Sequence, residues 1–84
     1  LLKDHQVGLK IMPNPLTTQT TIQSNPDSKI KGIVVYDVNG RVIRSVKNVN
    51  TNQFVLQRNN MPNGIYYVQI GFEKGNITKS IVVQ

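Results

Sequence analysis

The stretch Gly32–Val46 constrains the fold most, because it places a turn sequence between two arms rich in β-branched residues. The turn is Asp37-Val38-Asn39-Gly40, and it permits two geometries. One is a two-residue Asn39-Gly40 loop. The other is a type I turn that begins at Asp37 and leaves Gly40 in the left-handed region as a bulge. Either geometry makes a β-hairpin the central element of the fold.

The bulged turn is favoured by the cross-strand pairs that it would form. It sets Asp37 opposite Arg41, Tyr36 opposite Val42, and Val35 opposite Ile43. The two-residue loop would instead pair charged residues with valines. Since like side chains and opposite charges stabilise adjacent strands, we predict the bulged turn and its register.

Five further β-rich runs are separated by turn sequences at intervals of about 8 to 12 residues. The runs are Leu9–Met12, Thr17–Gln23, Phe54–Leu56, Ile65–Phe72 and Ile77–Gln84. With the two hairpin arms they make about seven strands, and no helical period competes with them. This pattern predicts an all-β, antiparallel β-sandwich, with an open barrel as the structural alternative.

Alternation within the runs predicts which side chains face the core. In Thr17–Gln23 the polar side chains of one face predict an edge strand that meets water. In Ile65–Phe72 the Tyr66 side is expected to be buried and Tyr67 exposed. A tyrosine just after a turn can donate its hydroxyl to upstream backbone, by analogy with the tyrosine corner of sandwiches. In Ile77–Gln84, the residues Ile77, Lys79, Ile81 and Val83 share one face.

The composition offers little chemistry to an active site. The chain has 84 residues, no cysteine and four scattered acidic residues: Asp4, Asp27, Asp37 and Glu73. His5 stands alone, and the glycines are isolated turn residues, so we predict no catalytic residue, no metal site and no cofactor. The formal charge of +6 comes from dispersed Lys and Arg, which favours solvated strand edges over a nucleic-acid site. No apolar run is long enough for a membrane helix, and no direct membrane insertion is expected.

Residues 1–8 have no sustained period, and we predict that they are a linker from an upstream cargo domain, with the folded domain at residues 9–84. The chain begins at Leu1 without an initiator Met. It is therefore expected to be a piece of a longer precursor.

Four segments, in their order and spacing, resemble one known family. They are Ile11–Pro15 (Ile-Met-Pro-Asn-Pro), Val34–Val42 (Val-Val-Tyr-Asp-Val-Asn-Gly-Arg-Val), Met61–Val68 (Met-Pro-Asn-Gly-Ile-Tyr-Tyr-Val) and Lys79–Val83 (Lys-Ser-Ile-Val-Val). Together they look like the C-terminal sorting domain of the type IX (Por) secretion system, and the likeness covers roughly residues 9–84. The family often ends on a basic residue, whereas this chain ends on Gln84.

The resemblance implies an immunoglobulin-like sandwich at the end of an exported Bacteroidetes protein. Such a domain directs its cargo from the periplasm through an outer-membrane translocon to the cell surface or beyond, with shuttle proteins as partners. A sortase then usually removes it. By position, Pro13, Asn14 and Pro15 match the family's opening corner, Asp37, Gly40 and Arg41 its central turn, and Gly64 and Tyr66 its second turn.

The resemblance also places the region read by the translocon in the terminal strand. We expect Lys79, Ile81, Val82 and Val83 to serve in recognition of the sorting signal, because a terminal edge strand offers unpaired backbone groups to an added strand. The alternative function is an accessory carbohydrate-binding or adhesive β-sandwich module. That alternative requires a row of exposed aromatic side chains, of which the sequence suggests only Tyr67.

Overall fold

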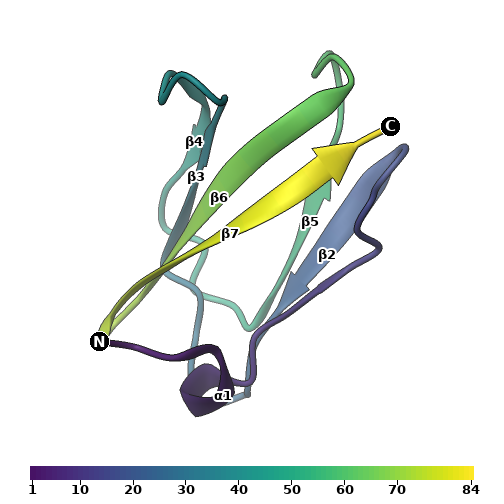
Figure 1. Ribbon diagram of the computed structural model, residues 1–84. Helices are drawn as coiled ribbons and strands as arrows, with labels where there is room; N and C mark the ends of the chain where they lie inside the picture. The colour runs from purple at the N-terminus through teal and green to yellow at the C-terminus, as the bar shows by residue number, and fades with distance from the viewer.

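Two antiparallel sheets pack face to face in the computed structural model, which describes residues 1–84 (Figure 1). The elements are α1 (Asp4–Val7), β1 (Lys10–Met12), β2 (Gln19–Gln23), β3 (Gly32–Tyr36), β4 (Val42–Val46), β5 (Gln53–Gln57), β6 (Gly64–Phe72) and β7 (Gly75–Val83). One sheet has the order β1-β2-β5 and the other has the order β4-β3-β6-β7. The predicted seven-stranded sandwich is therefore confirmed.

The central hairpin has the predicted bulged turn. Gly40 adopts a φ of 82°, its N–H donates to the carbonyl of Asp37 at 3.0 Å, and the N–H of Asp37 donates to the carbonyl of Arg41 at 3.0 Å. Tyr36 lies opposite Val42, as expected. Glycine is favoured at position 40 because it adopts this backbone conformation without the cost that a side chain brings.

The predicted register is wrong one residue further from the turn, where Val35 lies opposite Arg44 instead of Ile43. A second bulge in β4 moves Arg44 to the inner side of the sheet. From there its guanidinium donates to the carbonyls of Gln57 at 2.6 Å and Arg58 at 3.4 Å, across the gap between the sheets. These bonds to the other sheet favour the bulge, which bends an edge strand toward its partners.

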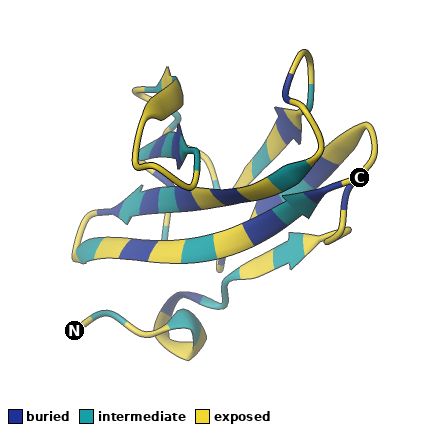
Figure 2. Ribbon diagram, turned by 45° about the horizontal axis from the view of Figure 1, so that its top comes forward, coloured by how far each residue is buried: buried dark blue, intermediate teal, exposed yellow.

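The core lies between the sheets and follows the predicted alternation. Burial alternates along β6, where Tyr66 is 6% exposed and Tyr67 is 41% exposed. The same alternation runs along β7, the strand that ends near C in Figure 2. The core side chains are Val7, Leu16, Ile22, Ile30, Ile33, Val35, Leu56, Met61, Tyr66, Val68, Ile70, Phe72, Ile77, Ile81 and Val83.

The predicted edge position of Thr17–Gln23 is wrong, because β2 lies between β1 and β5. Its inner face is buried at Thr20 and Ile22, and its polar face meets water on the outside of the sheet. Alternation along a strand reports which face is buried and does not report how many neighbours the strand has.

Residues 1–8 include one helical turn that the sequence pattern did not indicate, since four residues are too few to reveal a helical period. Val7 at its end is 4% exposed and joins the core. Asp4 forms an ion pair with Lys79 of β7 at 2.7 Å. The role of residues 1–8 as a linker stays a prediction. No helix in the structure has the length and hydropathy that a membrane span requires.

Candidate functional site

β7 is the strand on which the predicted recognition residues lie, and it forms one edge of the four-stranded sheet. It pairs with β6 along its full length, from Gly64 opposite Val83 to Phe72 opposite Gly75. One side of its backbone is therefore satisfied by β6. The backbone N–H and C=O groups on the other side of β7 point away from the sheet, where they can form hydrogen bonds with residues outside it.

The four predicted recognition residues divide between the two faces of β7. Ile81 and Val83 are 0% and 1% exposed and belong to the core. The side chain of Lys79 is 43% exposed, and its Nζ lies 2.7 Å from Oδ2 of Asp4. Val82 is half-buried on the outer face, opposite Ile65. Of these four residues, only Lys79 and Val82 have side chains that another protein could contact in the folded domain.

The outward edge of β7 is closed near its end by Leu16. The N–H of Leu16 donates to the carbonyl of Val82, and the N–H of Gln84 donates to the carbonyl of Leu16, each at 2.9 Å. Leu16 and Val83 thus form a parallel bridge. Leu16 is itself 0% exposed, so core packing holds this bridge in place.

Asn14 closes the next part of the same edge with its side chain. Its Oδ1 accepts from the N–H of Val82 at 2.9 Å, and its Nδ2 donates to the carbonyl of Ser80 at 3.3 Å. Pro13 and Pro15 flank it, both after cis peptide bonds. The sequence placed all three residues in a corner between strands, and it gave no sign that Asn14 contacts β7.

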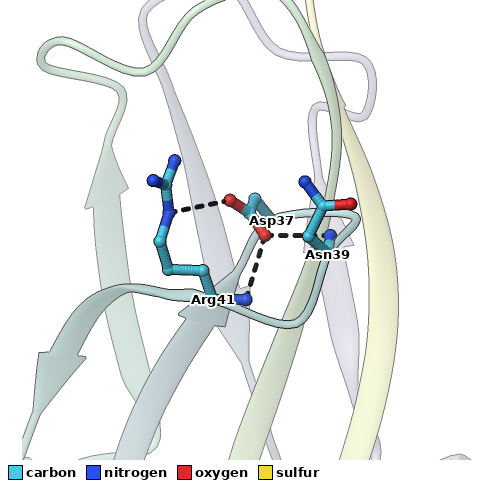
Figure 3. Close-up of polar contacts among 3 residues, drawn as sticks. All are labelled: Asp37, Asn39 and Arg41. Carbon is cyan, nitrogen blue, oxygen red and sulfur yellow. Dashed lines mark hydrogen bonds and ion pairs between the residues drawn. The ribbon is translucent and has the colours of Figure 1, made fainter.

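The central turn positions Asp37 and Arg41 as predicted (Figure 3). Oδ1 of Asp37 accepts from the N–H groups of Asn39 and Arg41, each at 2.9 Å, and Oδ2 accepts from Nε of Arg41 at 3.1 Å. The backbone N–H of Arg41 is the main cause that lowers the pKa of the Asp37 carboxyl, with further contributions from the N–H of Asn39 and the Arg41 charge. These bonds stay within one turn, which indicates a structural role.

The second turn contains the predicted tyrosine corner. The hydroxyl of Tyr66 donates to the carbonyl of Pro62 at 2.7 Å, four residues upstream. Gly64 has a φ of 150° in the same turn. The bond satisfies a buried phenol and fixes the turn that leads into β6.

Arg58 joins several segments of the fold, and the sequence pattern did not predict this role. Its Nη1 donates to the carbonyls of Gln84 at 2.6 Å and Thr17 at 3.2 Å, its Nε donates to the carbonyl of Met61 at 3.0 Å, and its Nη2 donates to Oδ1 of Asn63. One guanidinium therefore joins residue 84 to the segment before β2 and to the turn before β6. A single arginine at the end of a strand is too common in sequences to have revealed this.

The remaining ionisable side chains do not gather into one site. No group of three or more His, Cys, Asp or Glu lies close enough to hold a metal ion. A hollow of about 320 Å³ beside α1 is lined in part by Lys29, Lys31, Lys74, Asp27 and Glu73. The carboxylates offset most of the lysine charge there, so the hollow has no strong preference for an anion.

Comparison with known protein families gives a match that covers all seven strands of the domain. Residues 10–84 match the family described as the secretion system C-terminal sorting domain. No curated protein matches the chain. The match extends from the first residue of β1 to the last residue of the sequence and includes both turns, the Asn14 corner and β7. The chain therefore belongs to the family of secretion system C-terminal sorting domains, the sorting signals of type IX secretion.

Proposed function

We propose that this chain directs an attached upstream cargo protein from the periplasm across the outer membrane, and that a sortase removes the domain after transport. The family match over residues 10–84 carries this proposal. Membership implies interaction with a type IX secretion system and export to the cell surface or the extracellular space. The outer-membrane translocon, shuttle proteins and sortase are the partners that the proposal adds.

We place the surface read by the transport machinery on the exposed groups of β7. Lys79 and Val82 are its accessible side chains among the four residues considered. Ile81 and Val83 contribute through the fold, because their side chains are buried. Deleting the end of β7 would remove core side chains, so it would test folding and recognition together.

A fusion experiment separates the effect of a substitution on recognition from its effect on folding. Residues 1–84 are fused to a secreted reporter in a host with a type IX system, and surface delivery is compared with that of the unfused reporter. A Lys79→Gln, Val82→Ser double variant leaves the buried side chains of β7 (Ile77, Ile81 and Val83) unchanged. A Lys74→Gln variant, at an exposed turn residue, serves as the control.

The fused wild-type domain is expected to deliver the reporter, the Lys74→Gln control to deliver it equally well, and the double variant to deliver much less. Circular dichroism of the purified domain checks that the double variant is folded. If the wild-type fusion is not delivered, the proposed function is wrong. If the wild-type and the folded double variant are delivered equally, the function stands and the assignment to Lys79 and Val82 fails.

One observation favours a second function, that of a carbohydrate-binding or adhesive module. Tyr36 and Tyr67 lie directly opposite each other on β3 and β6, on the outer face of the four-stranded sheet. The strand residues on that face include no charged side chain: Gly32, Val34, Tyr36, Val42, Ser45, Ile65, Tyr67, Gln69, Gly71, Asn76, Thr78, Ser80 and Val82. Two neighbouring aromatic rings on an uncharged face suit a neutral glycan. Binding on a glycan array that Tyr67→Ala abolishes would support this function, and absence of binding would remove it.

A further inference from the structure

The outward edge of β7 has a closed part and an open part. In an antiparallel pair, the N–H and C=O of one residue point to the same side of the strand, and successive residues alternate. Val82 and Gln84 bond outward to residues of the Asn14–Leu16 segment, so Ser80 and Thr78 also point outward. The carbonyl of Ser80 is bonded to Asn14. The N–H of Ser80 and both backbone groups of Thr78 have no partner.

Asn14 occupies the place of a residue in a parallel strand. In a parallel ladder, one residue donates to the residue before its partner and accepts from the residue after it. Leu16 does this around Val83 with its backbone. Two residues earlier on both strands, the same pattern would centre on Ile81. There Asn14 supplies the donor for Ser80 and the acceptor for Val82 from its side-chain amide.

We propose that Asn14 is an edge guard: its carboxamide replaces the peptide group of a neighbouring strand and so prevents β7 from pairing with the β7 edge of a second copy of this chain. A carboxamide carries the same N–H donor and C=O acceptor as a peptide group. An unguarded edge strand is a template for pairing with another chain.

The surroundings of the edge indicate why a guard is needed. Thr78 and Ser80 are exposed and uncharged. The charge of Lys79 is offset by Asp4 at 2.7 Å. Nothing along this edge therefore repels a second copy by charge, which is a common protection of edge strands. Removing the Asn14 amide would add the carbonyl of Ser80 and the N–H of Val82 to the open groups and extend the open edge from Thr78 to Val82.

The test uses the chain of residues 1–84 with Asn14→Ala, and Asn60→Ala as a control. Asn60 is exposed and its side chain makes no hydrogen bond. Amide hydrogen exchange is measured at Val82, and the oligomeric state is measured by sedimentation over a range of concentrations. In wild type and in Asn60→Ala, we expect a protected Val82 amide and a monomer. In Asn14→Ala, the Val82 amide should exchange about five to ten times faster, and the chain should self-associate.

Two further variants keep the test decisive. Asn14→Asp has the same shape, retains an acceptor for Val82 and loses the donor to Ser80. It should keep Val82 partly protected and associate less than Asn14→Ala. Adding Ser80→Pro to Asn14→Ala removes the outward N–H of Ser80, which has no partner in the domain, so it should restore the monomer.

Three results would overturn the proposal. The first is unchanged exchange of Val82 in Asn14→Ala, and the second is a monomeric Asn14→Ala at millimolar concentration. The third is self-association that persists with Ser80→Pro. None of these measurements depends on export, so the edge guard and the proposed transport function can fail separately.

Discussion

Replacing Arg58 with methionine removes four hydrogen bonds and leaves most of the aliphatic stem of the side chain in place. Three of the bonds lie at exposed positions and one is partly buried. We therefore use the lower part of the range for a net hydrogen bond, about 0.5–1 kcal/mol each. The expected loss in the free energy of unfolding is about 2–4 kcal/mol.

That loss is large for a domain of 84 residues. Such a domain has a total stability of about 4–13 kcal/mol, so Arg58→Met should stay folded with a much smaller margin. The midpoint of thermal unfolding should fall by roughly 10–25 °C. Arg58→Lys should lie between wild type and Arg58→Met, because an ammonium group keeps the charge but cannot present a planar fork of donors to several carbonyls.

Urea unfolding followed by far-ultraviolet circular dichroism measures these differences. Arg44→Met is the matched control, because Arg44 also donates to two backbone carbonyls between the sheets but does not contact Gln84. Its loss should be about half that of Arg58→Met. If Arg58→Met unfolds within about 1 kcal/mol of wild type, or if Arg58→Lys is as stable as wild type, the four hydrogen bonds of the Arg58 guanidinium do not stabilise the domain as expected here.

Three smaller predictions concern the two turns. Tyr66→Phe should lower the free energy of unfolding by about 1–2 kcal/mol, because a carbonyl loses its partner, whereas Tyr67→Phe should change it by less than about 0.5 kcal/mol in the same urea assay. Gly40→Ala should cost about 1–2 kcal/mol from its φ of 82° alone, since nothing lies within 4 Å of the added Cβ; a loss near zero would contradict the turn geometry. The lowered pKa of Asp37 means that its contribution to stability is present above the unfolded pKa of about 3.9 and is lost as the pH falls through the folded value. In a carboxyl NMR titration, Arg41→Gln should leave that pKa still below the ordinary value, because the backbone N–H groups remain, and a full return to the ordinary value would assign the shift to the Arg41 charge instead.

Much of the fold could be predicted from the sequence, because the turns and the buried faces of the strands depend on residues that are close together in the chain. The Asp37–Gly40 turn requires a positive φ at Gly40, and only residues within the turn decide this. Alternation along β6 and β7 likewise depends on neighbours two residues apart, so the buried faces were predicted correctly. Tyr66 followed from the same logic, because its hydroxyl bonds to a carbonyl only four residues upstream.

The sequence by itself thus determined the turns, the faces of the strands and the family to which the chain belongs. Only the tertiary structure decided that β2 is an inner strand, that Arg44 shifts the register of β4, and that Asn14 and Arg58 hold the end of β7. The contacts of Asn14 span 66 and 68 residues of the chain. Such contacts depend on which strands become neighbours when the two sheets pack, and the period of a strand carries no record of that choice.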